Sequence, residues 1–185
     1  LIEVLARKDR ANILIVGETG VGKTCLIESL VKLVKDKQMP GSLANMNPFE
    51  LDIISLSQGV SYKGEIEDRF KDVVKDILNN THPALIIENF HRIEDKQSIL
   101  NGLLPILKKL LSKNQIQLIC TTTIDGYTKD IENDKELIAY FEKIIVEEPS
   151  EELAVQILQS KYKEYETKED LNDILENRKK SLDNE

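Results

Sequence analysis

Several features that would narrow the function of this protein are scarce or missing in its sequence. The 185 residues include two cysteines, Cys25 and Cys120, which lie far apart and outside any CxxC or histidine-rich pattern. This excludes the usual spacings of a cysteine–histidine metal site. We expect both to be reduced, packed thiols, with a single disulfide as the alternative. No apolar run approaches the roughly 20 residues of a membrane span. The start is interrupted by charges and has no cleavage site of a signal peptide. These absences predict a cytoplasmic protein with no membrane partner.

An excess of basic residues is also missing. The chain has 33 acidic and 25 basic residues, a net charge of −8, which argues against a nucleic-acid partner. The basic clusters, such as Lys108-Lys109, are interspersed with acids and are interpreted as solvated faces. Apolar residues make up 41% of the chain, enough to form the core of a globular domain. The abrupt apolar start suggests a piece of a longer polypeptide.

Strand and helix patterns alternate along the first 146 residues. The apolar runs predict strands at 13–16, 51–56, 84–87, 116–120 and 143–146. Helical stripes of apolar residues follow the first and second runs and precede the fourth. This alternation predicts an α/β fold with a five-stranded parallel sheet covered by helices on both sides. Pro149 and Ser150 mark a boundary, and Ser150 can cap the helix that follows. We therefore expect a large subdomain at 1–148 and a partial helical small subdomain or tail at 149–185.

One phosphate-binding motif is complete. Residues 17–24 read G-E-T-G-V-G-K-T, which satisfies G-x-x-x-x-G-K-[ST] between a predicted strand and a predicted helix. Glycines permit a tight loop whose N–H groups point at phosphate oxygens. Lys23 is expected to reach the outer phosphates, and the Thr24 hydroxyl is expected to bind Mg2+. The predicted nucleotide site comprises Gly17, Glu18, Thr19, Gly20, Val21, Gly22, Lys23, Thr24 and Cys25.

The absence of an N-K-x-D motif argues against a GTPase, and other motifs indicate a different class. Residues 57–70, S-Q-G-V-S-Y-K-G-E-I-E-D-R-F, resemble the G-x-x-Y-R-G-E-F-E-x-R segment of the Clp family of unfoldases. Residues 121–137 resemble that family's T-T-x-x-E-Y-x-K-x-I-E-K-D-x-A-L segment. Residues 147–152 and 5–12 also resemble family segments. From residue 1 to about 165, the chain therefore resembles the first AAA+ nucleotide-binding domain of ClpA, ClpB and ClpC.

The resemblance implies a P-loop AAA+ three-layer sandwich that binds ATP and Mg2+. It also implies other copies in a ring, expected to be a hexamer, and unfolded protein clients, and leaves open whether a Clp peptidase docks. Tyr62, Lys63 and Gly64 match the substrate-gripping pore loop, although Tyr62 alone would be read as capping the sheet edge. Thr122 and Thr123 match the sensor position, where strand-end hydrogen bonding is the alternative.

The chain departs from the family pattern in three respects. The family ends its third strand with Asp-Glu, where this chain has Glu88 and Asn89, a degenerate Walker B motif. Glu88 can still face the metal bound by Thr24, but Asn89 cannot act as a general base. His91 follows closely, yet we do not expect it to replace that base. The third departure is the absence of the family's arginine-finger pair, because Ala139 and Tyr140 occupy those positions. Lys143 lies nearby but lacks the planar fork of arginine.

Three functional hypotheses follow. The first is an ATP-binding module that supports ring assembly and substrate threading, with weak or absent hydrolysis of its own. The second is an active ATPase motor that drives protein unfolding for a Clp peptidase. The third is a non-enzymatic scaffold or adaptor that binds nucleotide.

Overall fold

The structure is a computed structural model that describes residues 1–7 and 11–150. The chain divides into a compact unit, Leu1–Glu147, and a second unit that begins at Glu148. The helix expected after Ser150, and nearly all of the small subdomain expected at 149–185, lie outside the described residues.

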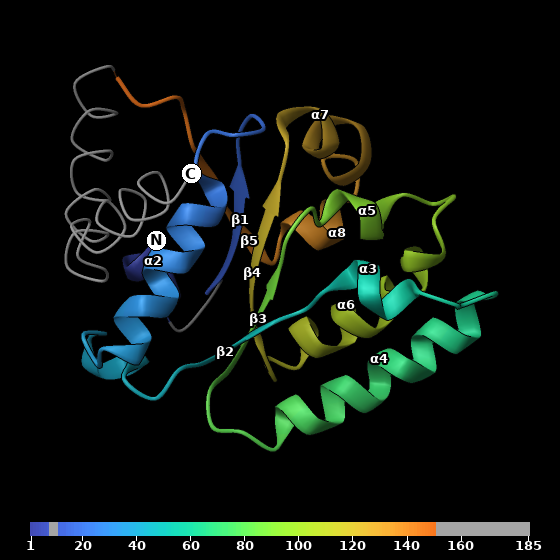
Figure 1. Cartoon of the computed structure of the whole chain (residues 1–185), viewed down its shortest axis with the longest axis horizontal. Coiled ribbons are helices and arrows are strands. Elements are labelled where there is room, and N and C mark those ends of the chain that lie inside the picture. The colour runs from blue at the N-terminus through green and yellow to red at the C-terminus, as the bar shows by residue number, and fades with distance from the viewer. Residues whose placement is uncertain (8–10, 151–185) are drawn as a thin grey trace, which may run out of the picture. The chain divides into compact units, whose positions relative to one another are not determined.

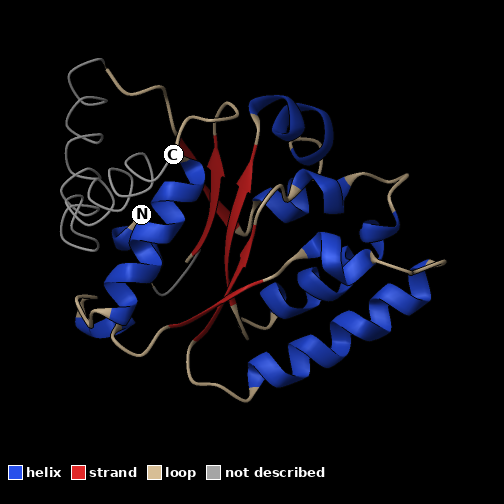
Figure 2. Ribbon diagram, viewed as in Figure 1, coloured by secondary structure: helices blue, strands red, loops and turns tan. Residues whose placement is uncertain are grey.

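Five parallel strands form the centre of the first unit (Figures 1 and 2). They are β1 (Asn12–Val16), β2 (Asn47–Glu50), β3 (Pro83–Ile87), β4 (Gln117–Thr122) and β5 (Phe141–Ile145), in the order β2-β3-β4-β1-β5. The predicted five-stranded parallel sheet is confirmed. Val16 of β1 pairs with Thr122 of β4 and with Ile145 of β5, so the carboxyl ends of these strands lie at one edge. Ligands of such sheets bind at this edge.

The second strand lies earlier in the chain than the sequence predicted. The expected strand at 51–56 is wrong: β2 is Asn47–Glu50, and most of 51–56 forms α3 (Ile53–Ser57). The Asp52 side chain begins this helix by accepting hydrogen bonds from the backbone N–H groups of Ile54 and Ser55, both at 3.0 Å. Pro48 is tolerated within β2 because this strand forms the edge of the sheet.

Helices cover both faces of the sheet, as predicted. On one face, α1 (Ile2–Leu5) and α2 (Lys23–Lys35) pack on side chains that include Ile13, Ile15, Ile86 and Ile119. On the other, α4 (Lys63–Leu78) and α6 (Leu104–Ser112) pack on side chains that include Leu14, Val16, Leu85, Ile87, Leu118 and Cys120. Odd and even positions thus point to opposite faces, as the pleat of a strand requires. Figure 1 shows α2 on one side of the sheet and α4 with α6 on the other.

Short elements connect these layers. They are η1 (Gly41–Leu43), α5 (His91–Glu94), η2 (Ile99–Leu103), α7 (Ile124–Gly126), a π-helical turn η3 (Tyr127–Ile131) and α8 (Lys135–Ile138). Cys120 is buried, Cys25 is half-buried, and both are free thiols, as expected. Within residues 1–7 and 11–150, no helix combines the length and apolar character needed to cross a membrane.

Candidate functional site

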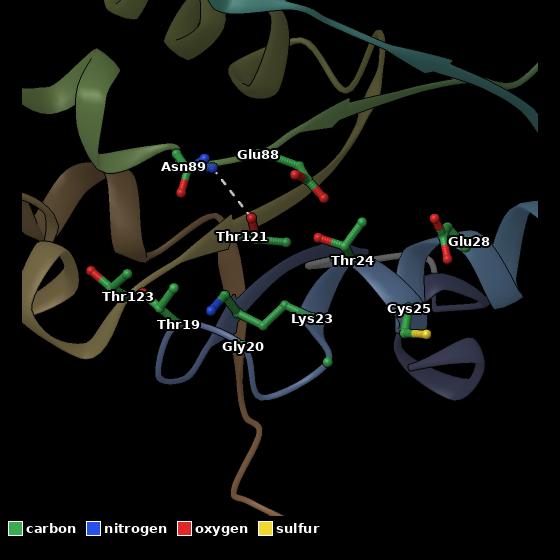
Figure 3. A pocket seen from close by; sticks show the side chains of 11 residues that line it. Thr19, Gly20, Lys23, Thr24, Cys25, Glu28, Glu88, Asn89, Thr121 and Thr123 are labelled. Atoms are coloured by element: carbon green, nitrogen blue, oxygen red, sulfur yellow. Dashed lines mark hydrogen bonds between the residues drawn. The ribbon is translucent and has the colours of Figure 1, made fainter. Parts of the chain in front are cut away.

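A pocket of about 410 Å³ opens at the carboxyl edge of the sheet, beside the start of α2 (Figure 3). It is lined by residues of the 17–24 loop and α2, by the residues that follow β3, and by the end of β4. The lining consists of Thr19, Gly20, Gly22, Lys23, Thr24, Cys25, Glu28, Glu88, Asn89, Thr121 and Thr123. The fold therefore brings the glycine-rich loop and the Glu88–Asn89 pair to one site.

The loop between β1 and α2 depends on glycine in two ways. Gly20 and Gly22 have φ angles of 87° and 102°, in the left-handed region that side chains disfavour. Gly17 is required for a different reason: a Cβ there would lie 2.5 Å from the carbonyl oxygen of Val146. Val146 is held against the loop because its N–H donates to the carbonyl of Val16 at 2.8 Å. Gly17, Glu18 and Val21, which were predicted as part of the nucleotide site, do not line the pocket.

The start of α2 offers positive potential to the pocket. Gly22 is the N-cap residue, no side chain caps the helix, and the first turn carries no acid. The first N–H groups of the helix are therefore open to an anionic ligand, and the helix dipole favours negative charge there. The Lys23 ammonium donates to the carbonyls of Gly17 at 2.8 Å and Glu18 at 2.7 Å. A phosphate group would offer this ammonium a stronger, charged acceptor.

Thr24 and Glu88 supply oxygen atoms in the same part of the pocket (Figure 3). Glu88 follows β3 at an even position, so it lies on the face that α2 covers. In the described part of the chain, no three His, Cys, Asp or Glu side chains are arranged to hold a metal ion. This donor set fits Mg2+, which is usually held by one or two protein oxygens together with phosphates and water.

Asn89 lies beside Glu88 with an unusual backbone conformation. Its φ angle is 54°, a left-handed value that asparagine tolerates better than most residues. Its backbone N–H donates to the Thr121 hydroxyl at 3.2 Å, and its exposed side chain lines the pocket. A carboxamide at this position can orient a water molecule but cannot take its proton at neutral pH.

The structure separates the threonines at the end of β4. Thr122, predicted as a sensor, is fully buried and does not line the pocket. Thr123, the other predicted sensor, does line it, although its hydroxyl also accepts a hydrogen bond from the Gly126 N–H at 3.0 Å. Thr121 lines the pocket, and the sequence reasoning missed it. Thr121 could have been predicted, because side chains two positions apart in a strand lie on the same face of the sheet. Thr121 is two positions after Ile119, which packs on the face covered by α2.

His91 lies behind the pocket and is not among the residues that line it. Its Nδ1 is 3.0 Å from the Thr122 hydroxyl, and a Cβ at Gly126 would lie only 2.5 Å from the imidazole ring. Burial lowers the pKa of His91, which favours the neutral imidazole. This packing agrees with the expectation that His91 does not replace the missing base.

The predicted pore-loop residues lie at the start of α4, away from the nucleotide pocket. Tyr62 is the N-cap residue of α4 and is 65% exposed, while Lys63 and Gly64 form the first turn. A Cβ at Gly64 would lie 3.2 Å from the Tyr62 ring, so the ring lies over this glycine. Arg69 anchors the preceding loop by donating to the carbonyl of Gln58 at 2.8 Å. The exposed Tyr62 ring therefore lies next to a loop whose backbone is held by a hydrogen bond.

The two positions expected to lack arginine fingers lie between α8 and β5. Ala139 is exposed, and Tyr140 is half-buried with its carbonyl accepting a hydrogen bond from the Asn12 side chain at 3.0 Å. The Lys143 ammonium lies 4.6 Å from the centroid of the Tyr127 ring, a cation–π distance. The Lys143 ammonium thus interacts with an aromatic ring of its own chain.

This geometry matches a known family. The profile described as "ATPase family associated with various cellular activities (AAA)" matches residues 13–147. The chain belongs to this family. The match covers the whole pocket lining and all five strands apart from Asn12, the first residue of β1, and membership of this family implies nucleotide binding.

The chain is similar to proteins named as chaperones and as ATP-binding subunits of a Clp protease. It is 35% identical to Chaperone protein ClpB 1 of a Nostoc species, over 90% of this chain and 19% of the relative. It is 32% identical to the ATP-dependent Clp protease ATP-binding subunit ClpL of Staphylococcus aureus, over 89% of this chain and 24% of that protein. In the Hsp104–ADP complex of S. cerevisiae, the similar region has a TM-score of 0.77 and 36% identity, covering 89% of this chain and 23% of that one. The AAA chain thus spans about a fifth to a quarter of these relatives.

Proposed function

We propose that this chain is the ATP-binding AAA+ module of a Clp-type protein unfoldase, and that it hydrolyses ATP weakly or not at all. The observation that carries the proposal is the combination of a complete phosphate loop with a carboxamide at the position of the base. Lys23 and the open start of α2 favour phosphate binding, while Asn89 lines the same pocket and cannot accept a proton.

The phosphate loop and five lining side chains have roles in this proposal. The loop N–H groups and Lys23 would hold the β- and γ-phosphates, and Thr24 with Glu88 would hold Mg2+, which would neutralise phosphate charge. Asn89 and Thr121 hydrogen-bond a water near the γ-phosphate without activating it. A general base contributes about 10²–10⁴-fold and an arginine finger about 10³–10⁵-fold to such reactions. Losing both leaves binding intact and suppresses turnover.

ATP binding without hydrolysis is sufficient for one function of this module, the assembly of a ring. A ligand stabilises whichever state binds it, so ATP at this site would hold neighbouring copies together in a ring, expected to be a hexamer. The client would be an unfolded polypeptide, gripped by the exposed Tyr62, and a Clp peptidase is a further candidate partner. In support, one of the similar Hsp104 structures is a complex with casein, with 36% identity and a TM-score of 0.77.

Two substitutions test the proposal. Lys23→Ala should abolish binding of a fluorescent ATP analogue, since it removes the cation of the phosphate site. Asn89→Glu should bind the analogue as well as the original chain and should accelerate ATP hydrolysis by about 10²-fold, because it restores a carboxylate base. Steady-state phosphate release measures both. If the original chain turns over as fast as Asn89→Glu, the binding-only function is wrong.

An active ATPase is the second candidate, and the placement of Glu88 favours it. Its carboxylate projects into the pocket near Thr24, a placement that supports a shared role of the two side chains in holding Mg2+ despite the altered motif. Under this alternative, the original chain would release phosphate at a substantial rate and Glu88→Gln would abolish that release, whereas the binding-only function predicts little or no release from either protein.

A further inference from the structure

A second polar pocket, of about 470 Å³, lies where the end of α5 meets η3 and the start of α8. None of its lining residues lines the nucleotide pocket. Glu94, Asp130 and Asp134 are among its acids, and its basic residues are Lys96, Lys129 and Lys135. The family resemblance and the nucleotide chemistry leave this pocket without a role.

Glu94 has no hydrogen-bond donor for one of its carboxylate oxygens. The residue is 5% exposed, and its Oε1 is buried without a partner in the part of the chain that the structure describes. Its backbone is fixed, because the Asn101 side chain donates to the carbonyls of Ile93 at 3.0 Å and Glu94 at 3.4 Å. A buried carboxylate without a donor is costly, so this group needs either a proton or a ligand.

Lys108, a positive charge near Glu94, forms its hydrogen bonds with other carboxylates. The Lys108 ammonium donates to Asp134 Oδ2 at 2.6 Å and to Glu136 Oε2 at 3.0 Å. Asp134 is satisfied on its other oxygen by the Leu137 N–H at 2.9 Å. The ammonium of Lys129, which lines the pocket, pairs with Asp125 at 2.9 Å. Two nearby cations are therefore committed to other carboxylates.

The protonation of Glu94 reflects this environment. Burial, followed by the charge of Asp134, raises the pKa of the Glu94 carboxyl to about 7, with Asp130 adding to the effect. Lys108 and Lys96 oppose the rise. Of the other charges on the lining, Asp95 and Lys135 are exposed, and Lys129 is exposed and paired. A cation that enters the pocket would favour the ionised form and recover the missing hydrogen bond.

The chemistry of the lining selects the ligand class. An anion would leave Glu94 unmatched, and no three described His, Cys, Asp or Glu side chains, at this pocket or elsewhere, are arranged to hold a metal ion. Asp130 is half-buried on the same lining, so a planar fork of N–H donors could serve two carboxylates at once. Rotation of the terminal torsion of Glu94 exchanges its two oxygens, which lets an entering donor reach either.

We propose that this pocket binds the guanidinium group of an arginine side chain from another polypeptide, with Glu94 and Asp130 as acceptors. The site is independent of ATP binding. The polypeptide is either a second copy of this chain or a separate peptide, since both present the same guanidinium chemistry.

The first test uses N-acetyl-arginine amide as the probe and N-acetyl-citrulline amide as its uncharged control. With the full chain carrying 13C-labelled carboxyl groups, the arginine probe should shift the Glu94 carboxyl resonance, and the citrulline compound should not. Affinity should fall about tenfold from pH 8 to pH 6, as a carboxyl with a pKa near 7 becomes protonated. Glu94→Gln should weaken binding about tenfold, by loss of a charge-assisted hydrogen bond, and Asp130→Asn should also weaken it.

The matched control is Glu132→Gln, which removes the same charge from an exposed position outside the pocket lining and should change binding less than twofold. Equal binding of the two compounds, pH-independent binding, or equal effects of Glu94→Gln and Glu132→Gln would overturn the proposal. Sedimentation then identifies the source. Self-association weakened by Glu94→Gln assigns the guanidinium to a second copy, whereas unchanged self-association with probe binding retained assigns it to a separate peptide.

Discussion

Replacing Asn89 by alanine and by glycine separates its backbone conformation from its chemistry. Asn89 has a φ angle of 54° and an exposed side chain, so neither change removes buried packing. The left-handed conformation costs an ordinary L-residue about 1–2 kcal/mol, and glycine and asparagine escape most of this cost. We therefore expect Asn89→Ala to lower the free energy of unfolding by about 1 kcal/mol, and Asn89→Gly to leave it within about 0.5 kcal/mol.

Urea denaturation followed by circular dichroism measures both changes, and two further asparagines are controls. Asn114 also has a positive φ, 51°, so Asn114→Ala should destabilise by a similar amount. Asn79 has a φ of −73° and is exposed, so Asn79→Ala should have little effect. Equal stability of Asn89→Ala and Asn89→Gly would contradict this prediction, because it would mean that the backbone at Asn89 is not held in the left-handed region.

Three further predictions concern the strand end, the buried acid and the phosphate loop. Thr121→Val should weaken ATP binding about two- to tenfold by loss of a hydrogen bond, whereas Thr122→Val, outside the pocket, should change it less than twofold; equal effects in a titration would reject the assignment of Thr121. The pKa of Glu94 rises from 4.5 to about 7 on folding, so the folded state binds the extra proton and stability is lost as pH rises through this window. Glu94→Gln should therefore raise the free energy of unfolding by up to roughly 3 kcal/mol at pH 8, with little gain at pH 4; a gain independent of pH would contradict this. Gly17→Ala should destabilise by about 1–3 kcal/mol because its Cβ meets a backbone carbonyl, while Gly41→Ala, with open space around it, should stay within about 0.5 kcal/mol in thermal unfolding.

The parts of the fold that the sequence predicted are those with regular apolar periodicity. β1, β3, β4 and β5 overlap the expected runs, and α2 and α4 follow their apolar stripes. The prediction of β2 was wrong because apolar character at 51–56 does not distinguish a buried strand from a helix. The Asp52 side chain caps the helix that forms there instead. The sequence of β2, N-P-F-E, is too polar and too short to be recognised as an edge strand.

The nucleotide site could be predicted because its motif is local, and the rest of the chemistry depends on the fold. Thr121 and Thr122 are adjacent and chemically identical, so only the face covered by α2 distinguishes them. Glu94 gave no signal in the sequence. Its burial, and the commitment of Lys108 to Asp134, arise from contacts between α5, α6 and α8 that lie up to 40 positions apart, from Glu94 to Asp134.

The identity of the nucleotide recovered from the protein tests the central claim most directly. The chain is incubated with Mg-ATP, freed of unbound ligand and denatured, and ATP and ADP are then separated by chromatography. We expect intact ATP from the original chain, ADP from Asn89→Glu, and neither nucleotide from Lys23→Ala. ADP from the original chain, absent from the Lys23→Ala control, would show that the site turns over and would contradict the role assigned to Asn89.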